Sequence, residues 1–367
     1  MVLDRTAPRC AGSVGLNSKN GGIYLNILTA LNAETPYSQR KLQLIFGAWV
    51  ASGLFDRSAT ISADDGDVSE DDYAKQSIYA LLYSVYREIG TVTDEHGAPY
   101  EFTFNTWGYD WPERWGAPPH SEREPQRFGQ NAYTGLFEFQ AVKEYAAARE
   151  GKLHIVELGC GTGAGAHHIC GQVWPDCTYI AIDMQGAAIQ TCERRHVPEL
   201  GGRLTAVHGD VTKVHIEPAS ADFVVICETH VAEYDGQVTD EDRAFFQKVF
   251  DTLKPGGFLV WGNAIPARTW QPCFDYLETV GMRQVEVHDV TEEAVRARQL
   301  DEARVDVYVE QCLARFHGFK IPVLGKKRRR QAELALKNFY RHPGTRLYEK
   351  MTDGTDSYRV ALFQKPA

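Results

Sequence analysis

The chain has 367 residues, of which 43% are hydrophobic and 24% charged, as expected for a globular protein with a full hydrophobic core. Its formal net charge of −10 argues against binding nucleic acid by phosphate neutralisation, which requires a basic surface. No stretch has the length and hydrophobicity of a transmembrane helix or the pattern of a signal peptide, so we expect a cytoplasmic location.

The eight cysteines form no C-x-x-C pair, and several lie within apolar strand or helix patterns. We therefore expect reduced, packed thiols rather than disulfides or a structural zinc site. We assign no residue as a metal ligand at this stage.

Residues 1–100 are predicted to form a mostly helical extension. Apolar residues recur at helical spacing over residues 23–31, 38–54 and 73–89, and the acidic stretch 62–72 between them is expected to be a solvated loop. Such an extension can cap a ligand site or form a homodimer contact, and both roles stay open.

Residues 101–145 are rich in aromatic side chains interleaved with Gly and Pro, and no regular period fits them. One interpretation is a hydrophobic plug between domains. The other is a lid whose rings line the pocket for an apolar or aromatic ligand, or face a cationic one. The two interpretations are compatible.

An apolar strand pattern at residues 154–158 runs directly into a glycine-rich turn at residues 159–163, and a helix pattern follows. Glycines place no side chain between backbone and ligand, so a nucleoside-bearing cofactor can lie against this turn and the next helix N-terminus. The turn also fits the loose dinucleotide fingerprint, with Asp183 as the following acid. Glu157 favours another cofactor, because a carboxylate repels a pyrophosphate but attracts a sulfonium compound that carries an ammonium group and no phosphate.

From residue 153 onward, strands alternate with helices, which predicts a parallel sheet covered on both faces. The expected strands and two of the helices between them are residues 153–158, 178–183, 203–208, 222–227, 258–261, 282–287 and 358–364, and residues 186–195 and 240–253. A helical excursion at residues 291–350 precedes the last strand. Its basic run, residues 326–330, is most simply a solvated helix start, with a phosphate or diphosphate clamp and a localisation signal as alternatives.

Residues 156–163 resemble, without a gap, the first motif of the class I S-adenosylmethionine-dependent methyltransferases, which is hydrophobic, acidic, hydrophobic, Gly-x-Gly-x-Gly. Residues 105–111, 131–133 and the turn 253–257 are similar to further elements of the small-molecule members, including natural-product and phthiotriol-like O-methyltransferases. The resemblance covers about residues 100–365 and is most specific in the cofactor motifs.

This resemblance implies an α/β fold with a seven-stranded Rossmann-like sheet, whose last strand lies antiparallel beside the fifth. The implied domains are the helical N-terminal extension at residues 1–100, an aromatic lid or linker at 101–145, and a methyltransferase core at 146–367 with a helical cap at 291–350.

The implied cofactor is S-adenosyl-L-methionine, which becomes S-adenosyl-L-homocysteine. At the strand ends, Asp183 is placed to accept hydrogen bonds from both ribose hydroxyls, and Asp210 is placed to meet the adenine amino group. The residues that we assign to the cofactor are Tyr133, Glu157, Gly159, Cys160, Gly161, Thr162, Gly163, Asp183, Met184, Asp210, Val211 and Glu228.

The reaction chemistry is expected just after the fourth strand of the sheet, where Glu228, Thr229 and His230 follow an apolar run. This stretch resembles the Glu-x-x-His sequence of natural-product O-methyltransferases, one residue shorter. His230 is the candidate base because an unperturbed imidazole has a pKa of about 6.5, and Glu228 is the second catalytic candidate. A histidine that only caps the strand is the structural alternative. Sugar O-methyltransferases often carry Asp where Asn263 stands, which leaves a second acid or a metal ligand unassigned.

The predicted function is methyl transfer to a small-molecule, secondary-metabolite acceptor, at oxygen. One alternative is a C-methyltransferase acting on an isoprenyl diphosphate, in which aromatic rings stabilise a carbocation and Glu228 removes the proton. Outside this class, the alternatives are an NAD-dependent oxidoreductase and a non-catalytic protein that binds the cofactor.

Overall fold

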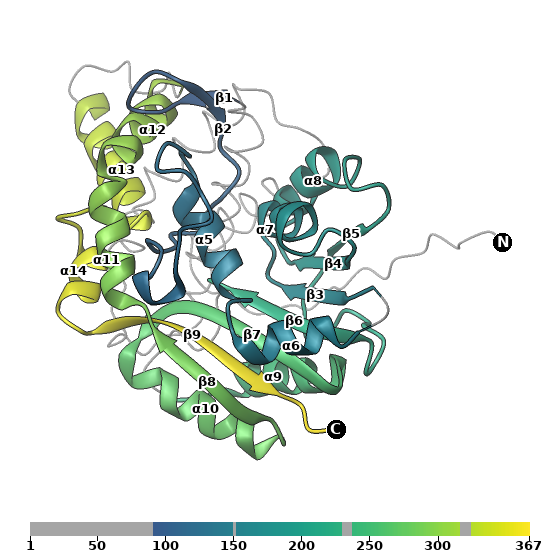
Figure 1. Cartoon of the computed structure of the whole chain (residues 1–367). Coiled ribbons are helices and arrows are strands. Elements are labelled where there is room, and N and C mark those ends of the chain that lie inside the picture. Colours follow the sequence, from purple (N-terminus) through teal and green to yellow (C-terminus); the bar gives the residue numbers. More distant parts are fainter. Residues whose placement is uncertain (1–90, 150–151, 230–236, 316–323) are drawn as a thin grey trace, which may run out of the picture.

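The computed structural model describes residues 91–149, 152–229, 237–315 and 324–367 (Figure 1). The helices predicted within residues 1–90, the acidic loop between them and the candidate base His230 lie outside this range. The described residues form a central sheet with helices packed against it and a helical cap at one end.

The seven-stranded sheet confirms the predicted topology. Its strand order is β5-β4-β3-β6-β7-β9-β8, and the last strand of the chain pairs antiparallel with both of its neighbours. The strands are β3 (His154–Leu158), β4 (Thr178–Asp183), β5 (Leu204–His208), β6 (Ala221–Cys227), β7 (Leu253–Pro266), β8 (Arg283–Asp289) and β9 (Asp356–Gln364).

The core lies on both faces of this sheet. Every residue of β6 is buried, and its side chains alternate between two hydrophobic clusters, with Phe223 and Val225 in one and Val224 and Ile226 in the other. A strand in this environment has no polar face, which explains the continuous apolar run in the sequence.

Helices α7 to α10 connect the strands and cover the sheet. Helix α8 packs on β4 and β5, α9 on β6 and β7, and α10 on β8. A capping box between Thr239 and Asp242 starts α9. Among the described residues, the helical segments up to β8 are η1 (Glu113–Trp115), α5 (Arg127–Gly135), α6 (Gln140–Ala147), α7 (Ala164–His168), the π-helical turn η2 (Ile169–Val173), α8 (Gly186–Arg195), α9 (Asp240–Thr252), η3 (Ala267–Thr269) and α10 (Trp270–Thr279).

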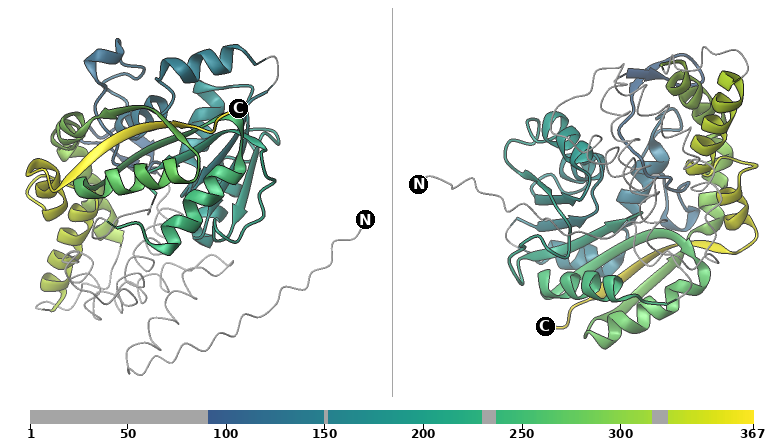
Figure 2. Two further views of the ribbon diagram at one scale, coloured as in Figure 1. Left: turned by 90° about the horizontal axis from the view of Figure 1, so that it is seen from below. Right: turned by 180° about the vertical axis from the view of Figure 1, so that it is seen from behind.

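The predicted helical excursion before the last strand is confirmed, and its described parts, residues 291–315 and 324–352, contain four helices. They are α11 (Thr291–Leu300), α12 (Glu302–Arg315), α13 (Leu324–Phe339) and α14 (Arg346–Thr352). Helices α12 and α13 lie side by side, as the two views in Figure 2 also show. The basic run at residues 326–330 falls near the start of α13, where Arg329 forms an ion pair with Glu310 of α12.

Two local details differ from the sequence predictions. A hairpin of β1 (Thr91–Thr93) and β2 (Pro99–Glu101) contacts α12, although this region was expected to be mostly helical. The turn predicted at residues 253–257 is absorbed into β7 as an irregularity, because Ala221 pairs with Leu253 whereas Phe223 pairs with Phe258. The hairpin forms by local pairing of two short strands, whereas in β7 pairing with the distant strand β6 outweighs the local turn pattern. Among the described helices, none has the length and apolar character needed to cross a membrane.

Candidate active site

A pocket opens beside the carboxyl ends of β3 and β6, which is where parallel sheets of this kind bind ligands. One wall is the glycine-rich turn and the start of α7, and the other is the segment that precedes α5, together with the last residue of α13. The lining residues are Thr103, Phe104, Asn105, Thr106, Trp107, Tyr133, Gly159, Cys160, Gly161, Thr162, Ala164, Gly165, Cys227, Glu228 and Phe339.

The glycine turn presents bare backbone to this pocket. Gly159 has a φ of +85°, and a Cβ atom there would lie 2.4 Å from Cγ2 of Thr229, so only glycine fits. Gly161, with a φ of +55°, lines the pocket directly. The hydroxyl of Thr162 donates to the carbonyl of Thr103 at 2.8 Å and thereby ties the turn to the opposite wall. The turn therefore allows a ligand to approach the backbone closely.

Asp183, the last residue of β4, stabilises the glycine-rich turn by hydrogen bonds to the backbone. Its Oδ2 accepts the Gly161 amide and its Oδ1 accepts the Gln185 amide, both at 2.8 Å. Burial raises the pKa of this carboxyl, and the two backbone hydrogen bonds oppose that rise. Each oxygen has a second lone pair, so Asp183 can still accept a hydrogen bond from a ligand.

Glu157 is fully buried within β3 and does not line the pocket. Its two carboxylate oxygens accept hydrogen bonds from the hydroxyls of Tyr133 at 2.8 Å and Tyr179 at 3.0 Å. Burial raises the pKa of Glu157 to about 7. Tyr133 does line the pocket, so any influence of Glu157 on a bound ligand is transmitted through that ring.

Glu228 stands immediately after β6 and adopts a left-handed backbone conformation, with a φ of +47°. Its carboxylate accepts the amides of Trp107 at 2.7 Å and Gly108 at 2.8 Å, and the hydroxyl of Tyr358 at 2.9 Å. Burial raises the pKa of Glu228, and the two backbone hydrogen bonds counteract this shift. Glu228 thus has a strained backbone and a carboxylate that accepts three hydrogen bonds. It acts as an anchor for the loop that contains Trp107 and Gly108.

Trp107 connects that anchor to the helical cap. Its indole Nε1 donates to the carbonyl of Phe339 at 2.6 Å, and the guanidinium of Arg341 lies 4.3 Å from the ring centroid. A hydrogen bond from the Arg298 guanidinium reaches the Trp107 carbonyl. One residue of the aromatic segment therefore contacts the end of β6, α11 and the end of α13.

The remaining predicted cofactor residues lie around the strand ends but outside the pocket lining. Met184 follows β4 with 49% of its surface exposed, and Asp210 forms an ion pair with Lys213 at 2.7 Å. Val211 packs partly buried beside the core, and Gly163 lies against Cys192 of α8. The structure thus brings Tyr133, Cys160, Thr162, Glu228 and the first two glycines of the turn into one pocket and leaves the others at its margin.

Asn263 has a structural task at this site. Its Nδ2 donates to the carbonyl of Thr229 at 2.7 Å, and the Thr229 hydroxyl donates to the carbonyl of Leu158 at 2.8 Å. These bonds fix the segment after β6 against the glycine turn. An amide serves here because the partner is a carbonyl acceptor, which an ionised Asp could not satisfy.

Sequence reasoning missed Tyr358, Arg298 and the position of Phe339 in the pocket wall. The hydrogen bond from Tyr358 to Glu228 joins residues 130 positions apart, and that from Trp107 to Phe339 joins residues 232 apart. The aromatic density of residues 101–145 was the one signal that pointed to this wall.

Residues 155–257 match a family model described as a methyltransferase domain. The matched range contains the glycine turn, Asp183, Asp210 and Glu228. The chain is an S-adenosylmethionine-dependent methyltransferase. Its cofactor fits the structure, since the bare turn at Gly159 and Gly161 faces the pocket and Asp183 stands directly behind it.

Two curated relatives of the methyltransferase, both from mycobacteria, match most of its length. A phthiotriol/phenolphthiotriol dimycocerosates methyltransferase of Mycobacterium tuberculosis is 24% identical over 265 residues, which is 72% of this chain and 86% of the relative. A fatty-acid O-methyltransferase of Mycolicibacterium smegmatis is 23% identical over 269 residues, covering 73% of this chain and 85% of the relative. These relatives support methyl transfer to a small-molecule acceptor.

Two solved structures that resemble the methyltransferase have low sequence identity to it. The [4+2]-cyclase SpnF has a TM-score of 0.49 and 15% identity, covering 78% of this chain and 92% of the cyclase. A geranyl diphosphate methyltransferase in complex with SAM has a TM-score of 0.48 and 14% identity, covering 72% of this chain and 99% of that one.

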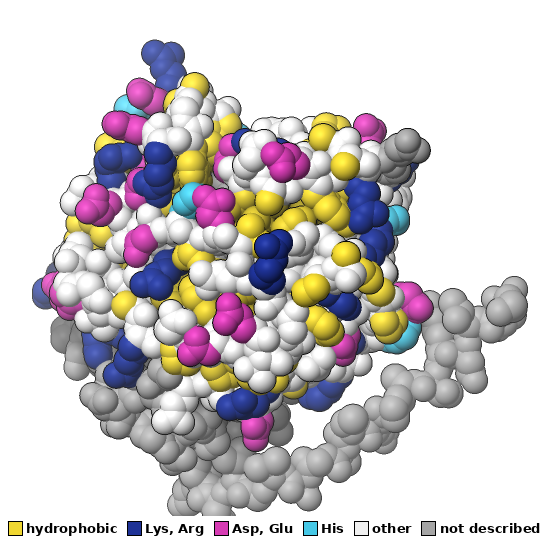
Figure 3. Space-filling view, turned by 60° about the horizontal axis from the view of Figure 1, so that its bottom comes forward, with side chains coloured by type: hydrophobic (Ala, Val, Ile, Leu, Met, Phe, Trp, Pro, Cys, Tyr) yellow, Lys and Arg dark blue, Asp and Glu magenta, His cyan; other side chains and the backbone are white. Residues whose placement is uncertain are grey.

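The surface of the methyltransferase in the view of Figure 3 mixes basic and acidic side chains with hydrophobic ones. On that face, Lys and Arg do not gather into one continuous patch.

Proposed function

We propose that the methyltransferase methylates an oxygen atom of a small, largely apolar acceptor. The observation that carries this proposal is the composition of the pocket. A wall of bare backbone faces a wall that carries the aromatic rings of Phe104, Trp107 and Phe339. The names of the relatives, one of which is a fatty-acid O-methyltransferase, support oxygen as the methylated atom.

The cofactor is assigned to the glycine wall. Gly159, Cys160, Gly161 and Thr162 would contact it, with Tyr133 at the rim. Asp183 would accept the ribose hydroxyls, and Met184, Asp210 and Val211 would surround the adenine. When bound, the cofactor supplies an electrophilic methyl group on a positively charged sulfur.

The acceptor is assigned to the aromatic wall. Among the described residues that line the pocket, none is Lys or Arg. A diphosphate needs such cations, usually as bidentate arginines, so this lining disfavours the isoprenyl diphosphate alternative. The apolar part of an acceptor packs against these rings without a desolvation penalty.

In this proposal the two catalytic candidates, Glu228 and His230, have different roles. The carboxylate of Glu228 accepts two backbone amides and a tyrosine hydroxyl, so its task is to hold the Trp107 segment in place rather than to take a proton. The base assignment therefore rests on His230, two residues later in the sequence, whose imidazole would remove the acceptor's hydroxyl proton.

The proposal is tested by offering purified protein and S-adenosylmethionine two sets of acceptors. One set contains fatty acids and long-chain alcohols, and the other contains geranyl and farnesyl diphosphate. Release of S-adenosylhomocysteine is measured for each. We expect turnover with members of the first set. Turnover confined to the diphosphates would overturn the assignment to oxygen.

A further inference from the structure

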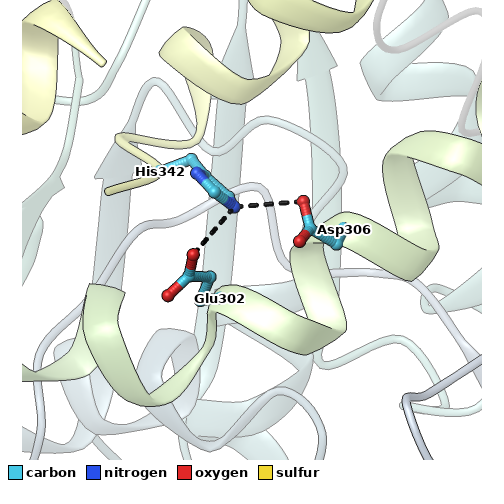
Figure 4. Close-up of side chains that lie close together, drawn as sticks. All are labelled: Glu302, Asp306 and His342. Atoms are coloured by element: carbon cyan, nitrogen blue, oxygen red, sulfur yellow. Dashed lines mark ion pairs between the residues drawn. The ribbon is translucent and has the colours of Figure 1, made fainter. Parts of the chain in front are cut away.

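Three ionisable side chains converge within the helical cap, and none of them lines the pocket. Glu302 and Asp306 stand one turn apart on α12, and His342 follows α13 (Figure 4). Nε2 of His342 lies 3.1 Å from Oδ1 of Asp306 and 3.9 Å from Oε1 of Glu302. In the described part of the chain, this is the group of potential metal ligands whose three ligand atoms lie within 4.8 Å of one another.

The imidazole of His342 is oriented in a way that leaves one nitrogen available. Its Nδ1 lies 2.8 Å from the carbonyl oxygen of Pro343, and a carbonyl only accepts, so Nδ1 carries the hydrogen. The residue is 7% exposed, and its Nε2 points at the two carboxylates at ion-pair distance, without the geometry of a hydrogen bond. The two anionic oxygens and this nitrogen therefore face one another, and a cation bound between them would be attracted by both carboxylates.

The charged side chains around the cluster also favour binding of a further cation. Lys337 lies 2.6 Å from Asp306 Oδ1 and 3.3 Å from Glu333 Oε1, so this ammonium is shared between two carboxylates. With Glu302, three carboxylates face one ammonium and one imidazole. The carboxylates therefore outnumber the groups that can carry a positive charge.

We propose that Glu302, Asp306 and His342 bind a divalent transition-metal cation of the Zn²⁺ or Mn²⁺ type. One imidazole nitrogen and two carboxylate oxygens are a donor set that suits these ions, and water completes their coordination. The hydrogen bond from Nδ1 to a backbone carbonyl is the usual support of a metal-binding histidine. The side chains of Glu302 and Asp306 are 52% and 45% exposed, so an ion can enter from solvent.

The site would fasten α12 to the end of α13. Phe339, three residues before His342, lines the pocket, and Arg341, one residue before it, stacks on Trp107. A cation at this position would therefore stabilise the outer wall of the acceptor side without touching the reacting atoms.

The test measures metal binding and thermal stability of the full-length protein, with no turnover assay, so its result is independent of the proposed function. Protein stripped with a chelator is titrated with ZnCl₂ and with MnCl₂, and bound metal and the melting temperature are recorded. We expect one equivalent of metal and a rise in the melting temperature. Glu302→Gln should weaken binding by at least ~10-fold, since even indirect partners of a metal matter by that much.

Two further variants sharpen this test. Lys337→Met removes the competing ammonium and should tighten binding, whereas His215→Ala, in an exposed His–Glu pair with a 3.6 Å separation, should leave binding unchanged. His342→Ala removes a buried side chain and can prevent folding, whereas Glu302 is half exposed, so Glu302→Gln should still fold. The test therefore uses Glu302→Gln. Stoichiometry and affinity that are the same in Glu302→Gln and the parent protein would overturn the proposal in favour of an ion-pair cluster of His342, Asp306 and Lys337.

Discussion

Replacing Glu228 by Gln tests whether this carboxylate is an anchor or a base. In the structure, Oε2 accepts the Trp107 amide, and Oε1 accepts the Gly108 amide together with the Tyr358 hydroxyl. A glutamine has one carbonyl oxygen and one NH₂ group. Whichever way it is oriented, its NH₂ faces one of the two backbone amides, and that amide loses its acceptor.

The size of this effect follows from the cost of one unsatisfied buried donor. A backbone N–H left without a partner costs about 1–3 kcal/mol, which is roughly a 5- to 150-fold change in the folding equilibrium. The matched control is Glu310→Gln, because Glu310 is 66% exposed and forms a surface ion pair with Arg329. We expect that control to change the free energy of unfolding by less than about 0.5 kcal/mol.

Urea unfolding of the parent protein and both variants measures the free energies, and initial rates with a working acceptor measure turnover. The anchor role predicts that Glu228→Gln loses stability and that its turnover falls because the Trp107 wall is displaced. A variant as stable as the parent protein whose turnover falls ~100-fold or more would refute the anchor role and restore Glu228 as the proton acceptor.

Three further predictions follow from the site. Asp183→Ala should weaken S-adenosylhomocysteine binding by roughly 5- to 150-fold in calorimetry, because ribose hydroxyls and the Gly161 amide lose their acceptor; unchanged affinity would show that Asp183 does not hold the ribose. Glu157→Gln should leave the free energy of unfolding unchanged near pH 4.5 and raise it near pH 8. Burial lifts the pKa of Glu157 from 4.5 to about 7, so the protonated carboxyl stabilises the fold at low pH. This stabilisation, about 3 kcal/mol, is lost as pH rises through 7. Urea unfolding of both proteins across this range checks the sign, and parallel curves would contradict it. His230→Ala should lower turnover by about 100- to 10,000-fold with an alcohol acceptor while cofactor affinity stays nearly intact, and a loss of only a few-fold would remove His230 as the base.

The sheet could be predicted from sequence because its signals are local. The apolar run that becomes β6 and the glycine turn after β3 each specify their structure within a few residues. The order of the strands came from the family resemblance, since periodicity alone does not fix which strand pairs with which. The structure confirms both the order and the antiparallel last strand.

The site could be predicted only in part, because its decisive contacts join distant segments. Glu228 was recognised as a polar residue at a strand end, but its partners Trp107 and Tyr358 come from either end of the described chain. Glu157 was expected to face the cofactor, yet side chains alternate along a strand, and the buried pair Tyr133 and Tyr179 occupies its carboxylate. Such pairings depend on tertiary packing, for which the sequence holds no local signal.

The most direct test of methyl transfer to oxygen uses S-adenosylmethionine with a trideuterated methyl group. Purified protein and this cofactor are incubated with a lipid and metabolite extract, and products that gain the labelled methyl are isolated by mass spectrometry and assigned by NMR. We predict either a labelled methyl ether whose formation is lost in His230→Ala, because an alcohol must give up its proton, or a labelled methyl ester, whose carboxylate precursor needs no base. A label attached to carbon, or a labelled methyl ether that forms equally well with His230→Ala, would contradict methyl transfer to oxygen with His230 as the base.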